Sequence, residues 1–301
     1  MRIATTTLSK MLSSSMGSSY NNYVNLLNKI AGGKNFTKVS ENPADATKVL
    51  KLKDELAKMN EYQSNIKAAN AEMNLAYDTL GDIVDELSNI NSSIAAASTG
   101  TTTPDAAKAY ADEIKEKVST IQDKINVKYL DNYIFSGTYT AVKPYDEIGG
   151  NITYQGSVDS ASNRNITIAE GKTYTYNLSG DKIFELDNNN NFFNEMKDLD
   201  NLLRQEPLDH DKIREKLDVL DTVSKNISQA QGTISAKVIK LSSLEESNAG
   251  QITKLTQDRV DLEEVDIIKA ASDLMSAQQA LQASYMVGSQ IMSSVSLLDY
   301  L

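Results

Sequence analysis

Apolar residues recur every three or four positions over most of the chain, which is the spacing of helices with one buried face. The longest such pattern runs from Val49 to Ile94, with steps of three and four and one extra step of three at Tyr62. At about 1.5 Å per residue, a helix of this length extends on the order of 80 Å. The pattern therefore predicts a coiled-coil-like bundle and not a compact globule.

Prolines mark where the helices begin and where the chain breaks. Asn42 precedes Pro43, and Thr103 precedes Pro104, so each pair predicts a capping side chain followed by a proline at the first helical position. The remaining two prolines, Pro144 and Pro207, indicate two further breaks. We therefore expect helices that start at Pro43 and Pro104.

Two further apolar patterns predict helices that pack on the first one. One runs from Ala107 to Ile125 and the other, which we expect to form one long helix, from Ile213 to Val265. Between them, residues 137–180 alternate Thr, Tyr and Ile between Gly and Asn turns, as in Asn151–Gln155 and Lys172–Leu178. That alternation predicts a small β-rich insertion.

The expected fold is mainly α, an elongated antiparallel helical bundle built from both ends of the chain and carrying an outer β-rich domain. The chain is expected to divide into five segments. Residues 1–40 form an N-terminal assembly segment and residues 266–301 a C-terminal one. Residues 41–136 and 191–265 form the two halves of the helical rod, and residues 137–190 form the β-rich outer domain.

The two terminal segments have the wrong polar faces for helices in water. No residue from Leu274 to Leu298 is charged, and residues 1–40 contain no acidic residue. A surface helix normally sets charges opposite its apolar stripe, yet these helices carry Ser, Gln and Asn there. Two interpretations stay open. The terminal helices are ordinary core helices of one bundle, or they pair with each other and with copies from neighbouring subunits and stay poorly ordered until assembly. On the second, the expected interface residues are Leu8, Leu12, Leu26, Leu281, Ile291, Val295 and Leu298.

Composition argues against most kinds of chemistry. The net charge of −11 disfavours a nucleic-acid partner, and a chain with no Cys and one His lacks disulfides, thiol nucleophiles and multi-histidine metal sites. We read His210 as part of a helix-capping turn, and the alternating Tyr174 and Tyr176 as strand packing. Acidic clusters such as Asp261–Glu264 are interpreted as solvated helix faces. We expect no catalytic residue, no cofactor site and no metal site, and therefore no enzyme.

Neither a Sec signal nor a membrane span is evident. The apolar residues near the N-terminus are separated by Ser and Lys, whereas a secretory signal needs a continuous apolar stretch. The uncharged run from Leu274 to Leu298 is long enough to cross a bilayer but is interrupted by Gln and Ser. We expect no membrane insertion.

Four segments resemble the flagellin-like axial proteins of the bacterial flagellum, and among them the hook-associated junction proteins. They are the turn Ile30–Ala46, the motifs YIFSGT at 133–138 and KPY at 143–145, GDKIF at 180–184, and the C-terminal motifs DLEEVD at 261–266, ALQASY at 280–285 and SLLDYL at 296–301. Pro43 is typical of the junction proteins and not of filament flagellin. Two departures are Asn35, where the family has Arg, and Asn42, where it has an acid.

This resemblance implies a structural, self-assembling protein that joins hook and filament. The implied partners are further copies of the chain, in a ring of roughly eleven, a hook-side junction protein, flagellin and an export chaperone. The implied location is extracellular, in the flagellum, reached through the flagellar type III export apparatus. The resemblance also implies that the terminal helices form an inner tube and that the β-rich domain faces outward.

Other functions remain open at this stage. A divergent flagellin that forms the filament itself is the nearest alternative. More remote are a carbohydrate-binding module displayed on a rod and a coiled-coil adaptor in the cytoplasm. The β-rich insertion contains neither His nor Cys, which disfavours hydrolytic chemistry there.

Overall fold

The computed structural model describes residues 2–186 and 190–298, with side chains for residues 7, 9–186 and 190–290. The chain divides into two compact units. Unit 1 comprises residues 1–58 and 251–301, and unit 2 comprises residues 59–250. The two ends of the chain thus form the first unit, and the central segment forms the second.

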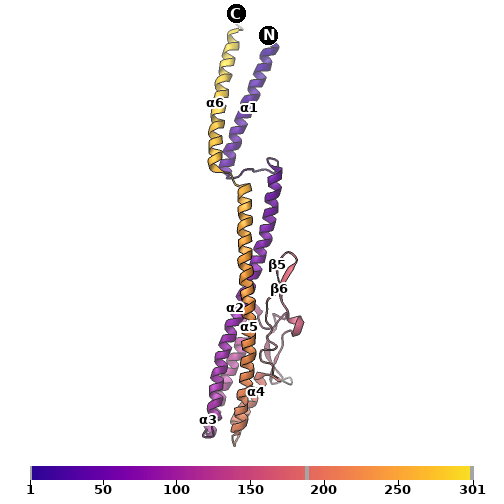
Figure 1. Cartoon of the computed structure of the whole chain (residues 1–301), viewed down its shortest axis with the longest axis vertical. Coiled ribbons are helices and arrows are strands. Elements are labelled where there is room, and N and C mark those ends of the chain that lie inside the picture. Colours follow the sequence, from indigo (N-terminus) through magenta and orange to yellow (C-terminus); the bar gives the residue numbers. More distant parts are fainter. Residues whose placement is uncertain (1, 187–189, 299–301) are drawn as a thin grey trace. The chain divides into compact units, whose positions relative to one another are not determined.

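Unit 1 is formed by helices from opposite ends of the sequence. Helix α1 (Arg2–Gly32) and helix α6 (Ile267–Leu298) lie side by side, at the top of Figure 1. The unit also contains the start of helix α2 (Pro43–Ala97) and the end of helix α5 (His210–Glu263). The expected pairing of the two terminal segments within the fold is therefore present.

Local capping explains where the helices begin. The Asn42 Oδ1 atom accepts the Asp45 N–H at 3.2 Å, and Thr103 accepts the Ala106 N–H at 3.3 Å at the start of helix α3 (Pro104–Ile125). Both prolines occupy the first helical turn, so both predicted helix starts are confirmed. At α5 the capping side chain is Asp209, which accepts the Lys212 N–H at 3.1 Å; His210 is the first helical residue.

The core of unit 2 follows the predicted apolar stripe. From Ile66 to Ile94 every stripe position of α2 is buried, whereas Leu52 and Leu56, nearer the start of the helix, are only half-buried. Apolar residues of α3, α5 and the short helix α4 (Phe192–Arg204) complete one continuous cluster with α2. The stripe from Ile213 to Val265 is one helix as expected, except that α5 ends at Glu263.

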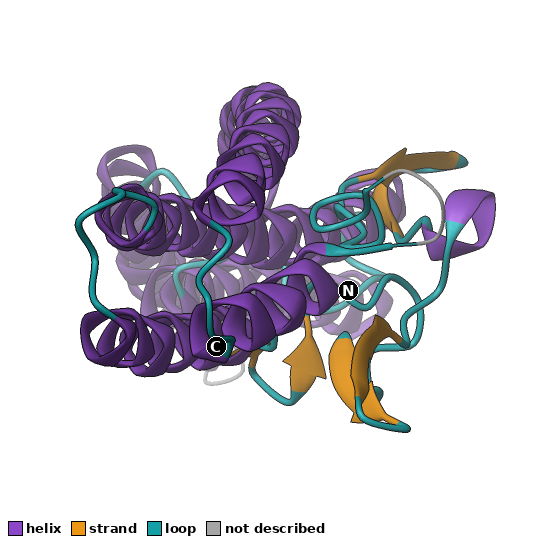
Figure 2. Ribbon diagram, turned by 90° about the horizontal axis from the view of Figure 1, so that it is seen from below, coloured by secondary structure: helices purple, strands orange, loops and turns teal. Residues whose placement is uncertain are grey.

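Among its described residues, the β-rich insertion has three separate two-stranded antiparallel sheets. They pair β1 (Lys128–Tyr129) with β2 (Asn132–Tyr133), β3 (Tyr145–Ile148) with β4 (Asn151–Tyr154), and β5 (Asn165–Ala169) with β6 (Lys172–Thr175). A single 3₁₀ turn, η1 (Asp159–Ser162), lies between the second and third sheets. The first hairpin precedes residue 137, the expected start of the insertion. Figure 2 shows these strands lying outside the helices of unit 2.

Aromatic packing holds the insertion to the helices. Tyr145, Phe184, Phe192 and Phe193 form a cluster with ring centroids 5.0–5.5 Å apart. The buried hydroxyl of Tyr145 donates to the main-chain oxygen of Gly180 at 2.7 Å. Because Phe192 and Phe193 start α4 and Tyr145 is the first residue of β3, the cluster joins the β3–β4 sheet to the helical core.

Candidate assembly surface

Small residues set the line along which α1 and α6 meet. Gly288 is buried, and a Cβ atom placed on it would lie 3.2 Å from the Met16 sulfur and 3.5 Å from Leu12 Cδ2. The hydroxyls of Ser19 and Ser284 lie 3.4 Å apart across the same line. The two backbones therefore approach closely because there is almost no side chain between them.

The pair leaves most of its apolar side chains uncovered. Among the described side chains of α1 and α6, only Ala270, Ala277 and Gly288 are buried. Large apolar residues point to solvent instead, with Met11 67% and Ile268 86% exposed. The other exposed ones are Tyr20, Leu27, Ile267, Met275, Tyr285, Met286 and Val287. We call these exposed residues of α1 and α6 the terminal apolar surface.

The predicted interface residues are placed only in part. Leu12, Leu26 and Leu281 are half-buried, and Leu12 lines the close approach at Gly288. Leu8, Ile291, Val295 and Leu298 belong to α1 and α6, but their side chains lie outside the described residues. Pairing within one chain thus accounts for part of the burial of the first three.

A short ladder ties the end of α1 to the end of α5. Gly33, at φ +64°, turns the chain out of α1, and Lys34 then forms an antiparallel bridge with Glu264. The Asn35 N–H donates to the main-chain oxygen of Glu263 at 2.9 Å, and the Val265 N–H donates to that of Gly33 at 3.1 Å. We call residues 33–35 and 263–265 the junction ladder.

Glu263 is a correction to the sequence-based interpretation. Its cluster was expected to be a solvated helix face, but Glu263 is only 9% exposed. Its carboxylate lies 2.8 Å from Lys53 Nζ, 3.3 Å from Lys34 Nζ and 3.9 Å from Arg259 Nε. The hydrogen bond from Lys53 is the main cause that lowers the pKa of Glu263, so the residue carries its charge in the folded state.

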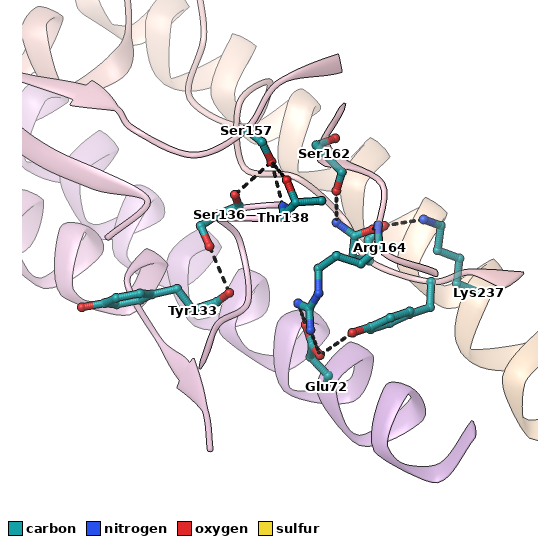
Figure 3. Close-up of polar contacts among 10 residues, drawn as sticks. Glu72, Tyr133, Ser136, Thr138, Ser157, Ser162, Arg164 and Lys237 are labelled. Carbon is teal, nitrogen blue, oxygen red and sulfur yellow. Dashed lines mark hydrogen bonds and ion pairs between the residues drawn. The ribbon is translucent and has the colours of Figure 1, made fainter. Parts of the chain in front are cut away.

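Unit 2 contains a second buried carboxylate that the sequence analysis did not single out. Glu72 on α2 accepts Arg164 Nη2 at 3.0 Å and the Tyr176 hydroxyl at 3.1 Å. Tyr176 follows β6 and bonds a helix, so strand packing does not describe its role fully. Figure 3 shows Arg164 between Glu72 on α2 and Lys237 on α5. The only signal in the sequence was an acid inside an apolar stripe, between Ala69 and Met73.

Metal-ion clusters and membrane-spanning helices were both looked for in the part of the chain that the structure describes. Over residues 2–186 and 190–298, no group of three or more His, Asp or Glu residues could hold a metal ion. Within that same part of the chain, no helix combines the length and apolarity needed to cross a bilayer.

Comparisons with known proteins bear on the same regions. Residues 3–140 match the family described as "Bacterial flagellin N-terminal helical region". This match includes α1 from its second residue, all of α2 and α3, and the whole β1–β2 hairpin. No curated protein matches the sequence significantly.

Solved structures of flagellar proteins share the fold. A putative flagellar hook-associated protein from Vibrio parahaemolyticus is similar at TM-score 0.69 and 20% identity, over 74% of this chain and 100% of that one. Flagellar hook-associated protein 3 from Legionella pneumophila is similar at TM-score 0.60 and 14% identity, over 70% and 98%. A flagellar junction protein from the same organism gives TM-score 0.57 and 13% identity, over 72% and 99%. The chain thus has the helical rod and β-domain fold of these proteins.

Proposed function

We propose that the chain is a structural, self-assembling junction protein of the bacterial flagellum. It joins the hook, through the other hook-associated junction protein, to the flagellin filament. The observation that carries this proposal is the terminal apolar surface on α1 and α6, the two helices formed by the ends of the chain. The flagellin-type match over residues 3–140 and the fold shared with hook-associated proteins support it.

The physical reason is the cost of leaving that surface in water. Covering a side chain such as Met11 or Ile268 is worth about 1.5–3 kcal/mol before the costs of association are counted. Charges would oppose burial on all sides, and none occurs from Leu274 to Leu298. Copies of the chain that pack their terminal helices together cover this surface and form a ring or a filament, depending on closure.

The remaining features of the proposal follow from the same role. The protein is not an enzyme, and its partners are other copies of the chain, in a ring of roughly eleven, the hook-side junction protein and flagellin. An export chaperone binds the chain before assembly. The chain leaves the cell through the flagellar type III export apparatus and resides in the extracellular flagellum. The absence of Cys is compatible with export in an unfolded state.

The proposal is tested by placing a charge in the predicted interface. We expect Leu281→Asp and Ile291→Asp each to abolish incorporation into flagella of cells that lack the native protein. Helix content of the purified chain should stay nearly unchanged. Asn89→Asp, a change at an exposed position of α2 in unit 2, is the control and should incorporate normally. Immunoelectron microscopy of detached hooks, with the label expected at the distal tip, provides the readout.

Two results would count against this assignment. Normal incorporation of both charged variants would show that the terminal helices are not part of the interface. Loss of all helical structure in them would show that these positions serve folding and not assembly.

The alternative of a divergent flagellin is favoured by the family match, which is to a flagellin helical region. Under that alternative the chain itself forms the filament. Cells that lack the gene would then still make hooks but would secrete no flagellin, because the missing chain is the filament protein itself. If such cells instead secrete flagellin that fails to stay attached, the junction role is supported.

A further inference from the structure

Glu72 is an unusual residue for its position. It lies on the buried face of α2, next to Ala69 and Met73, and only 4% of its surface is exposed. Both carboxylate oxygens are bonded, one to Arg164 and the other to Arg164 and Tyr176. Both partners come from the β-rich insertion, since Arg164 directly precedes β5 and Tyr176 directly follows β6.

The partners of Glu72 are themselves fixed by a second set of bonds. The Arg164 N–H donates to Asn177 Oδ1 at 2.7 Å, and Asn177 Nδ2 donates to the main-chain oxygen of Ser162 at 2.7 Å. Lys237 on α5 donates to the main-chain oxygen of Asn177 at 2.5 Å. The two ends of the β5–β6 hairpin are therefore tied to each other and then to two helices, as Figure 3 shows.

Glu72 is buried, and Arg164 and Lys237 are half-buried. Arg164 lies over the ring of Tyr176, with 5.1 Å between its Cζ and the ring centroid. Burial beside Glu72 raises the pKa of Tyr176, so that the phenol remains a hydrogen-bond donor. Burial also lowers the pKa of Lys237. The network thus keeps its donors and acceptors matched in a region of low dielectric.

A buried ion pair of this kind is poor at adding stability. The desolvation free energy of the two charges is about as large as the electrostatic attraction between them. Well-packed apolar residues in the same place often give equal or greater stability. What the pair adds is a strict requirement for position. An apolar surface accepts several alignments along a repeating stripe, whereas the Glu72 carboxylate is satisfied only where Arg164 and Tyr176 reach it.

We propose that Glu72 is an orientation key, which sets where and how the β5–β6 hairpin and its flanking residues dock on α2 and α5. A second part of the proposal concerns opening. When the hairpin detaches from α2, Glu72 and Arg164 become hydrated again. Detachment of the hairpin therefore costs less free energy than opening of the helical core. Glu72 therefore specifies one orientation of the insertion, and the insertion can detach while the helical bundle stays folded.

The test exploits the absence of Cys, which allows two labels to be placed without background. The double variant Ser64→Cys on α2 and Thr173→Cys on β6 changes two exposed positions, and a nitroxide label on each new thiol allows the distance between them to be measured. We expect one narrow distance distribution in the labelled parent. The triple variant E72L/R164M/Y176F, which fills the same space with apolar groups, should retain its helix content but give a broadened or multiple distribution.

Hydrogen exchange tests the opening. In Glu72→Gln, amides of residues 163–177 should exchange at least about tenfold faster, while those of residues 80–94 in α2 stay unchanged. Glu61→Gln, at an exposed position of the same helix, is the matched control and should behave as the parent. This proposal does not depend on the flagellar role, because both readouts use the isolated full-length chain.

The outcomes are decisive in both directions. A single parental distance in the triple variant would show that apolar contacts alone set the orientation, and the key would be rejected. Loss of helical structure in the triple variant, or equal acceleration of exchange in residues 163–177 and 80–94, would show that docking and bundle folding are one event.

Discussion

The side-chain amide of Asn35 donates to the main-chain oxygen of Glu264 at 2.8 Å, although 229 positions separate the two residues in sequence. The side-chain bonds of Asn35 go to main-chain oxygens, those of Glu264 and Leu262. With the main-chain bonds of the junction ladder, it joins the interruption after α1 to the interruption after α5. The chain segments that connect α1 and α6 to the rest of unit 1 are therefore bonded to each other.

Asn35→Ala should loosen the junction ladder without unfolding the chain. The change removes the side-chain bonds to Glu264 and Leu262 and leaves the main-chain bonds in place. A loss of about 1 kcal/mol of local stability is expected. The Val265 amide, which bonds Gly33, should exchange about five times faster. Asn89→Ala, at an exposed position of α2, should leave that rate unchanged; equal acceleration in both variants would contradict the prediction.

Acid should weaken unit 1 through Glu263. Its folded-state pKa lies below the ordinary 4.5, so the charged form stabilises the fold above that pH. The contribution is lost as the pH falls from about 4.5 through the lowered pKa. In thermal unfolding, the parent should melt above Glu263→Gln at about pH 6, and this gap should shrink in acid. Glu264→Gln, a change at the exposed neighbour, is the control. A gap that widens in acid would overturn the sign.

Gly288→Leu should separate α1 from α6. Its side chain would start 3.2 Å from the Met16 sulfur, closer than an ordinary van der Waals contact, so overpacking of about 1–3 kcal/mol is expected. Gly17→Leu is the matched control because a Cβ atom there meets nothing within 4 Å. Paired labels on α1 and α6 of the monomer should report a wider distance only for Gly288→Leu. A wider distance in both variants would point to a general effect of leucine on these helices.

Phe184→Ala should strongly destabilise unit 2. The ring is fully buried and packs against Tyr145, Phe192 and Phe193. Removing it leaves a cavity in a rigid cluster, for which a cost of about 3–5 kcal/mol is expected. Ile239→Ala removes a side chain that is largely exposed on α5 and should change stability by less than about 0.5 kcal/mol. Urea unfolding monitored by circular dichroism measures both, and similar midpoints would contradict the prediction.

Helices were predictable from the sequence because their causes are local. The stripe from Ile66 to Ile94, and the caps at Asn42 and Thr103, depend on residues within a few positions of one another. The hairpins were predictable only in part, since β1 and β2 have two residues each and carry almost no alternation. The predicted interface residues remain a prediction, because an interface with other copies depends on molecules outside the chain.

By itself, the sequence determined the helical periodicity, the position of the insertion and the lack of charge at the C-terminal end. Only the tertiary structure decided which acids are buried. Glu263 meets Lys53, and Glu72 meets Arg164, across 210 and 92 positions of sequence. Exposed and buried carboxylates look alike in a sequence, because burial depends on which distant segment the fold brings against each helix face.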